Sequence, residues 1–308
     1  MRRSVAAFTG SAASVLSVVP RSPAWYELRQ SGIGSSDAPA ILGLNPWKTP
    51  LEVYTEKLGL APPSQEDSEA AYWGRHIEPL VINRFRKETD RYVNRSAETV
   101  INKDRPWQLA SLDAVQRKDR RKPFGVLEVK CTGLRQRWDD GVPDYVNAQV
   151  QHQLAVTGWG FASVAVLFFG NQFFWADVER NEPFIDHLIE VEKEFWNRVV
   201  ELSPPPAGPT AADTKALQLL FPVDNGSSIT LAEGEYADLD ADRELLKASI
   251  GIDLAQLRTI ENKVKDMMGA HSEAVLSNGV RYTFKAQHRD GYTVEPADFR
   301  VLRRFAPK

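Results

Sequence analysis

The sequence contains little sulfur, no long apolar run and no strong excess of charge of either sign. Its 308 residues include one cysteine, Cys131, which excludes an intrachain disulfide and any zinc site built on several cysteines. No apolar run approaches the roughly 20 residues that a membrane-spanning helix needs. We therefore expect a soluble, cytoplasmic protein.

The charge balance argues against a protein that binds nucleic acid through an overall positive charge. With 38 basic and 41 acidic residues the net charge is −3, and the pI is near 6.0. A domain that binds nucleic acid through general basicity has a pI above about 9. Any contact with nucleic acid must therefore depend on locally positive patches, or on metal ions that offset acidic side chains.

Apolar residues make up 43% of the chain, enough for the core of one large domain or two smaller ones. We divide the chain into a flexible N-terminal arm (1–22), a mixed α/β domain (23–202), a proline-rich linker with a connecting segment (203–232), and a C-terminal helix with a β-hairpin (233–308). The run SPPPAGPT opens the linker and marks the clearest boundary, because consecutive prolines stiffen a chain.

Helix and strand signals alternate within the mixed domain. Apolar spacing and capping residues predict helices over 38–42, 50–57, 68–88, 144–158 and 181–202. We expect Asp37 to cap the first of these helices. Period-two alternation predicts that 107–116 and 124–131 are the two strands of a hairpin. This order of elements indicates a mixed sheet flanked by helices.

The chemically distinctive residues lie on those two strands. Residues two apart share one face of a strand, so Glu128 and Lys130 lie side by side among apolar neighbours. Asp113 comes fifteen residues before Glu128, on the strand expected to pair with theirs. Two carboxylates and a backbone carbonyl suit Mg²⁺ or Mn²⁺, and a lysine beside the metal can orient water. The alternative is a structural ion pair on a hairpin.

Five motifs in a fixed order carry a more specific signal. They are RQSGIGSSDAPAILGLNPWKTPLEVYTEKLG (29–59), WGRHIEP (73–79), LASLDA (109–114), LEVKC (127–131) and YVNAQVQHQLAVTG (145–158). Together they resemble the YqaJ-type phage recombination nucleases, relatives of lambda exonuclease within the PD-(D/E)xK fold. The resemblance covers residues 23–200 and implies an α/β core of the restriction-endonuclease type. Residues 203–308 have no counterpart in the lambda enzyme.

The resemblance implies catalytic roles for the matching residues. Asp113 and Glu128 look like the metal ligands, with the backbone carbonyl of Val129 as a third. Glu78 matches the family's helix glutamate near a second metal. Lys130 looks like the catalytic lysine that contacts the attacking water and the scissile phosphate.

Further matches concern the helix beside the active site and the DNA end. Gln151 matches the second glutamine of the family's Q-x-Q helix, which faces the active site. A core amide bonded to the backbone is the alternative for this residue. Arg29 and Ser36 match the residues that hold the phosphate of a DNA end, and Ser111 and Arg135 are further candidates for phosphate contacts.

These matches imply a Mg²⁺-dependent deoxyribonuclease, with Mn²⁺ as a substitute, that acts as a 5′→3′ exonuclease on double-stranded DNA ends in phage-type recombination. The 3′ overhang would pass to a single-strand annealing protein, and the lambda relative implies a ring-shaped trimer. The gene would belong to a phage or prophage in a bacterial host. Two alternatives stay open: a structure-specific or nicking endonuclease with the same residues, and a DNA-end binding scaffold that does not cleave.

Overall fold

The structure, a computed structural model, describes residues 13–16, 18, 22–61, 68–96, 98–119, 124–168, 171–230 and 235–288, together with Arg300, Leu302 and Arg304. The chain forms two compact units, Met1–Pro222 and Val223–Lys308. Part of the expected N-terminal arm is ordered: Ala13–Leu16 forms strand β1, which pairs with β4 (Thr99–Asn102). These four residues of the expected arm therefore belong to a sheet, and residues 1–12, 17 and 19–21 lie outside the described part of the chain.

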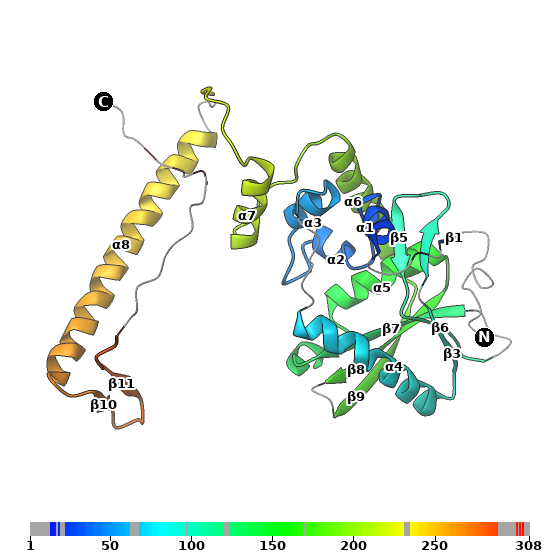
Figure 1. Cartoon of the computed structure of the whole chain (residues 1–308), viewed down its shortest axis with the longest axis horizontal. Coiled ribbons are helices and arrows are strands. Elements are labelled where there is room, and N and C mark those ends of the chain that lie inside the picture. The colour runs from blue at the N-terminus through cyan, green and yellow to red at the C-terminus, as the bar shows by residue number, and fades with distance from the viewer. Residues whose placement is uncertain are drawn as a thin grey trace. The chain divides into compact units, whose positions relative to one another are not determined.

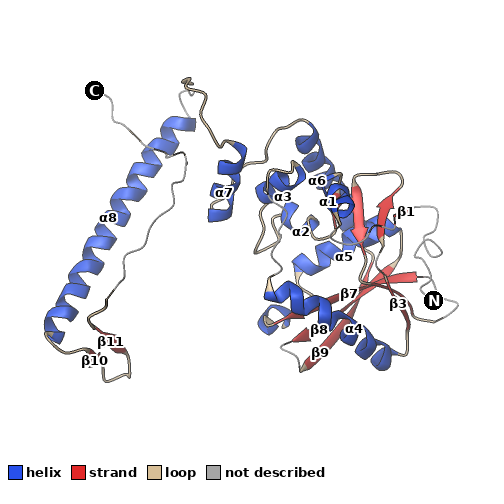
Figure 2. Cartoon of the chain, viewed as in Figure 1, coloured by secondary structure: helices blue, strands red, loops and turns tan. Residues whose placement is uncertain are grey.

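Two sheets build the first unit (Figure 2). The larger has the strand order β3 (Tyr92–Arg95), β6 (Ala114–Arg117), β7 (Phe124–Thr132), β8 (Phe161–Phe168) and β9 (Gln172–Glu179). The smaller has the order β1, β4, β5 (Gln108–Ser111) and β2 (Ile33–Gly34). In the larger sheet β7 and β8 are parallel and the other neighbours are antiparallel, so the expected mixed sheet is confirmed.

The segment 107–116 is two strands in different sheets, and the prediction of one continuous strand is wrong. β5 ends at Ser111 and pairs with β4 and β2, whereas β6 begins at Ala114 and pairs with β3 and β7. The buried Leu112 and the following Asp113 carry the chain from one sheet to the other. The packing face changes at the crossing: Ala110, Leu112 and Val115 lie in one core cluster, whereas Ala114 lies in another.

The helices of the first unit are α1 (Pro23–Gln30), α2 (Ala38–Ile41), α3 (Pro50–Lys57), α4 (Glu69–Thr89), α5 (Asp144–Thr157), α6 (Glu182–Val200) and α7 (Ala211–Leu220). Each of the five predicted helices is confirmed to within two residues. Thr49 and Glu52 form a reciprocal capping box at the start of α3. Gly158 ends α5 with a φ of 72°, a left-handed conformation that glycine adopts without strain.

Helices α5 and α4 cover opposite faces of the larger sheet (Figure 1). Val126 of β7 packs in one cluster with Val150 of α5, whereas its neighbour Leu127 packs in another with Phe85 of α4. Adjacent strand residues point to opposite faces, so β7 is buried on both sides. The strand that carries Glu128 and Lys130 therefore runs through the centre of the unit.

A buried polar network ties α5 to its neighbours. His152 Nδ1 lies 2.6 Å from Glu192 Oε1, and Nε2 lies 2.9 Å from the carbonyl oxygen of Leu109. Gln108 Nε2 donates to Glu192 Oε2 at 2.7 Å. Burial alone lowers the pKa of His152, but Glu192, the Leu109 carbonyl and Asp37 of the neighbouring loop together raise that pKa above its usual range.

This network predicts a pH-dependent stability. A histidine whose pKa is raised by folding stabilises the native state below the unfolded pKa of about 6.5, and that contribution is lost as pH rises through the folded pKa. We expect Glu192→Gln to remove this dependence, because the amide can still accept from Gln108 and can donate to a neutral His152. Urea unfolding at several pH values between about 6 and 9 gives the free energy of unfolding of the wild-type protein and of Glu192→Gln. Parallel pH profiles for the two proteins would contradict the role given to His152.

Residues beyond the proline-rich run still belong to the first unit. α7 packs against α3, and Ala216 is buried in the same cluster as Leu51 and Tyr54. The division between the units therefore falls at Pro222 and Val223 rather than at residue 202. The second unit contains α8 (Glu235–Met268) and a hairpin of β10 (Glu273–Val275) and β11 (Arg281–Thr283). Among the described residues, no helix has both the length and the apolar character needed to cross a membrane.

Candidate active site

The register of β6 and β7 places Asp113 beside Glu128. Ala114 pairs with Leu127 in this antiparallel ladder, so the residues one step outward, Asp113 and Glu128, also face each other. Asp113 Oδ2 accepts a 2.8 Å hydrogen bond from the backbone N–H of Val129. The sheet crossing thus delivers one carboxylate to the edge of the strand that carries the other.

Glu128 is 3% exposed, and three side chains donate hydrogen bonds to its carboxylate. Lys130 Nζ lies 2.7 Å and Gln149 Nε2 lies 2.6 Å from Oε1, while Gln153 Nε2 lies 2.7 Å from Oε2. Lys130 Nζ also donates to Gln149 Oε1 at 2.8 Å. These donors offset the large cost of burying a carboxylate away from water.

The charges of this cluster do not balance. Burial and the negative charges of Glu128 and Glu78 raise the pKa of Asp113 well above its usual range, against the hydrogen bond from Val129 and the charge of Lys130. Burial alone lowers the pKa of Lys130, but the carboxylates of Glu128 and Asp113 raise it, so the ammonium group stays charged. Asp113 and Glu128 share the one ammonium of Lys130, an arrangement that a divalent cation would relieve.

The side chains of the cluster supply only some of the ligands that such a cation needs. Within the described residues, no group of three or more His, Cys, Asp or Glu side chains is arranged to hold a metal ion. Glu78, on α4, accepts from Arg95 Nε at 2.8 Å. Asp113 and Glu128 nevertheless offer hard carboxylate oxygens, and Mg²⁺ is commonly held by one or two carboxylates with water in its other positions.

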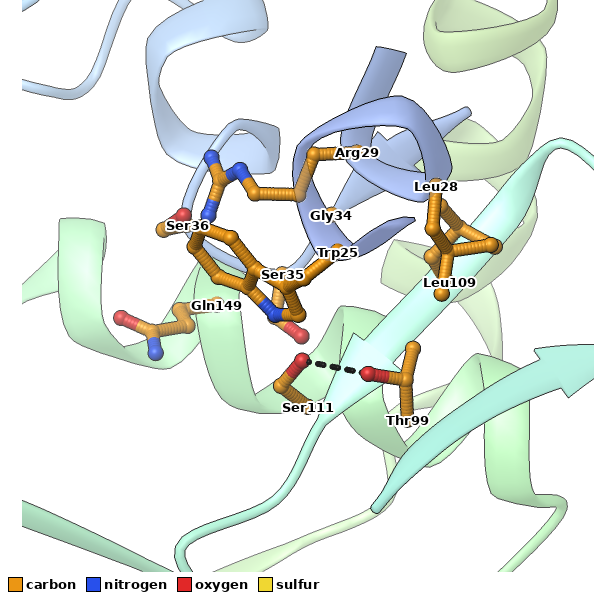
Figure 3. A pocket seen from close by; sticks show the side chains of 10 residues that line it. All are labelled: Trp25, Leu28, Arg29, Gly34, Ser35, Ser36, Thr99, Leu109, Ser111 and Gln149. Carbon is orange, nitrogen blue, oxygen red and sulfur yellow. Dashed lines mark hydrogen bonds between the residues drawn. The ribbon is translucent and has the colours of Figure 1, made fainter. Parts of the chain in front are cut away.

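A cavity of about 80 Å³ opens next to this cluster (Figure 3). Its lining comes from α1, β2, the loop before α2, β4, β5 and α5. It consists of Trp25, Leu28, Arg29, Gly34, Ser35, Ser36, Thr99, Leu109, Ser111 and Gln149. Gln149 belongs to both places, since it lines the cavity and bonds Lys130 and Glu128. Gln149 therefore links the cavity to the carboxylate cluster.

A guanidinium group and several hydroxyl groups line the cavity. Arg29 lies one helical turn after Trp25, and its guanidinium carbon is 5.1 Å from the indole centroid. The Ser35 hydroxyl is buried with no hydrogen-bond partner among the described residues, and Ser111 Oγ lies 3.0 Å from Thr99 Oγ1. A guanidinium group and several hydroxyl groups around one small space are typical of a phosphate site.

Asp37 anchors the cations behind the cavity. Its carboxylate is fully buried, with Oδ2 2.6 Å from Lys57 Nζ and Oδ1 3.3 Å from both Lys48 Nζ and Arg29 Nη2. Oδ2 also accepts from the backbone N–H of Gly34 at 3.1 Å. Burial alone raises the pKa of Asp37, but these cations lower it well below its usual range. The expected capping bond to α2 is absent, although Asp37 occupies the N-cap position.

Two of the predicted site residues lie outside this arrangement. Gln151 donates to the carbonyl of Glu179 at 2.8 Å and accepts from the N–H of Asn181 at 3.0 Å, which is the backbone-bonded core amide that the sequence left as an alternative. Arg135 pairs with Asp139 within its own turn, at 2.8 Å. Neither side chain contacts the carboxylate cluster or lines the cavity.

Sequence reasoning missed Gln149 and Gln153, which make the contacts expected of Gln151. A signal was available, because residues four apart share one face of a helix whereas a residue two positions away points elsewhere. The sequence analysis also did not identify three residues that line the cavity, Trp25, Ser35 and Thr99. Nothing in their local sequence distinguishes them from ordinary strand, helix and turn residues.

Comparison with known proteins agrees with this architecture. The model of the YqaJ-like viral recombinase domain matches residues 24–160. Over 251 residues the chain is 34% identical to the uncharacterized protein YqaJ of Bacillus subtilis, covering 79% of this chain and 77% of that protein. The residues matched by the family model include Asp113, Glu128, Lys130 and all of the residues that line the cavity.

The fold is also similar to that of a solved exonuclease. The crystal structure of LHK-Exo, an alkaline exonuclease from Laribacter hongkongensis, in complex with dAMP superposes with a TM-score of 0.50 at 18% identity, covering 59% of this chain and 94% of that chain. A second crystal structure of that enzyme has a TM-score of 0.49 at 19% identity with the same coverage. The larger sheet with α4 and α5 is thus a core of the PD-(D/E)xK type, and the chain belongs to the YqaJ-like viral recombinase family.

Proposed function

We propose that this protein is a Mg²⁺-dependent deoxyribonuclease that degrades double-stranded DNA from its ends in the 5′→3′ direction. The observation that carries the proposal is the junction at Gln149, which joins an anion cavity to a lysine and two carboxylates. A terminal phosphate in the cavity would place the next linkage of the same strand at the carboxylates. The similar exonuclease LHK-Exo was crystallised with a nucleoside monophosphate, dAMP.

The residues of the cluster divide the work as follows. Asp113, Glu128 and the backbone carbonyl of Val129 would hold the metal, with Glu78 nearby. A bound Mg²⁺, or Mn²⁺ in its place, would acidify a water molecule and offset charge on the leaving oxygen. Lys130 would orient the attacking water and stabilise the negative charge that develops on the phosphate.

The cavity would select DNA ends. Arg29 presents a planar fork that can hold two phosphate oxygens, while Ser36, Ser111 and the unpaired Ser35 hydroxyl can donate further hydrogen bonds. A terminal phosphate carries more charge than an internal linkage, so it fits this cavity better. We propose this preference as the reason for attack at ends rather than within a chain.

The proposal predicts a measurable preference for phosphorylated ends. Linear duplex with a 5′-phosphate should be digested at least about 10-fold faster than the same duplex with a 5′-hydroxyl, and Arg29→Gln should abolish the difference, since charge-assisted hydrogen bonds contribute roughly 1.5–3 kcal/mol. Arg198→Gln is a matched control: both side chains are about one-third exposed and both pair with a carboxylate. Release of label from each strand end in Mg²⁺ reports both the rate and the direction.

A closed circular duplex in the same experiment tests the alternatives. Cutting of the circle would favour a structure-specific or nicking endonuclease, and binding of ends without any cutting would favour a scaffold. The intact pair of carboxylates with Lys130 supports cleavage over the scaffold. We further propose, from the family, that the 3′ overhang is passed to a single-strand annealing protein and that the enzyme forms a ring-shaped trimer around DNA.

A further inference from the structure

An exposed tryptophan lies beside the site and has no part in the core. Trp47, in the loop between α2 and α3, is 58% exposed. The Tyr145 ring meets it edge-on, with centroids 5.3 Å apart and planes at 90°. The Arg137 guanidinium carbon lies 5.2 Å from the indole centroid. Leaving so large an apolar surface in water forfeits stabilisation that a buried ring would provide.

Contacts connect Trp47 to both halves of the site. Its neighbour Lys48 bonds Asp37, which also holds Arg29 at the cavity. On the other side, Tyr145 precedes Gln149 by one turn of α5, and Gln149 bonds Lys130. The Tyr145 hydroxyl and the Lys130 ammonium are also close enough to interact electrostatically. The indole therefore lies on the surface that spans the cavity and the carboxylate cluster.

The loop that carries the indole is fixed in place. The backbone N–H of Trp47 donates to Asn45 Oδ1 at 2.8 Å. Pro46 precedes it, and the Thr49 capping box begins α3 two residues later. A ring presented by a rigid loop loses little conformational entropy when a ligand covers it, which is the property of a preorganised contact.

We propose that Trp47 is a stacking surface for a nucleobase, namely the base of the terminal nucleotide whose 5′-phosphate occupies the Arg29 cavity. The inference rests on the proposed function and adds a contact that phosphate binding does not require. A nucleotide joins a flat aromatic ring to an anion, and here a cation, the Arg137 guanidinium, lies over the face of the exposed indole. Base–aromatic stacking of this kind tolerates every sequence, as an end-degrading enzyme needs.

A base stacked on Trp47 cannot remain paired in the duplex. The terminal nucleotide would therefore be held unpaired, with its phosphate in the cavity and its base on the indole. Arg137, which now lies over the ring, would move to the backbone of the same strand as the base takes its place. Tyr145 would stay against the ring edge, since an edge-on contact leaves the ring face available.

The test is a double-mutant cycle that combines a change of Trp47 with removal of the terminal base of the DNA. All proteins also carry Lys130→Met, so that the DNA is not cut during the binding measurement. Kd is measured by fluorescence anisotropy for a 5′-phosphorylated duplex whose terminal 5′ nucleotide either carries its base or is abasic. Trp47→Ala should weaken binding of the normal end by roughly 5- to 100-fold and leave binding of the abasic end unchanged. Trp47→Phe should recover part of the loss, because a smaller aromatic ring still stacks.

Trp73→Ala is the matched control, since Trp73 is 55% exposed on α4, where it bonds Glu69, and does not line the cavity. Equal losses on the two DNAs, or no loss on either, would overturn the role of Trp47 while leaving the proposed nuclease intact. Failure of the Lys130→Met protein itself to prefer phosphorylated ends would overturn the proposed function, and this inference with it.

Discussion

Replacing Lys130 with methionine is expected to lower the single-turnover rate of DNA hydrolysis by roughly 10²- to 10⁴-fold, the range that a positioned proton-transfer or charge-stabilising group contributes. Methionine keeps the apolar stem and removes the ammonium group. Glu128 would keep its bonds to Gln149 and Gln153, so the carboxylate should stay in place. The loss should therefore fall on the chemical step.

Binding measurements separate this effect from a loss of affinity. Kd for a 5′-phosphorylated end should change little in Lys130→Met, because Lys130 does not line the Arg29 cavity. Lys193→Met, on the exposed face of α6, controls for loss of one positive charge. If Lys130→Met digested linear duplex at the rate of the wild-type protein, Lys130 would have no part in the reaction.

Asp37→Asn is expected to lower the free energy of unfolding of the first unit by about 3–5 kcal/mol, the usual cost of removing one partner of a buried ion pair. The Lys57 side chain is only 2% exposed, and its ammonium lies 2.6 Å from Asp37 Oδ2. Lys48 and Arg29 lose the same partner. All eight tryptophans lie between residues 25 and 196, so tryptophan fluorescence during urea unfolding reports this unit alone.

A compensating change tests the cause. Asp37→Asn combined with Lys57→Met should be more stable than Asp37→Asn alone, because no buried charge is then left without a partner. The comparison pair is Arg198 and Glu194 on the surface of α6, where Glu194→Gln should cost less than about 0.5 kcal/mol. A double variant as unstable as Asp37→Asn would show that the loss comes from packing or from the Gly34 hydrogen bond instead.

The sequence was a good guide wherever the signal was local. The capping box at Thr49, the glycine at the end of α5 and the apolar spacing of α4 set helix boundaries within a few residues, and the expected antiparallel pairing holds for β6 and β7. The resemblance located Asp113 and Glu128, which the structure brings side by side. These features depend on residues that are near one another in the chain.

Features that depend on distant partners could not be predicted. In the sequence Asp37 looks like a helix N-cap, and only the folded structure places the Lys57 ammonium beside it. The break between β5 and β6 depends on distant strands, because β5 pairs with β4 and β2 whereas β6 pairs with β3 and β7. Gln149 and Gln151 have similar sequence neighbourhoods, and the orientation of α5 on the sheet decides which one reaches Glu128.

The crossing between the two sheets fixes the distance between the cavity and the carboxylate cluster. Ser111 ends the strand that lines the cavity and Asp113 opens the carboxylate cluster, so one intervening residue, Leu112, sets their separation at about 7 Å along the chain. Because Leu112 is buried in the core, this length cannot stretch without disturbing the interior. In the proposed enzyme the step taken from a DNA end would be fixed by covalent geometry, and neither loop motion nor DNA sequence could change the size of the fragment released.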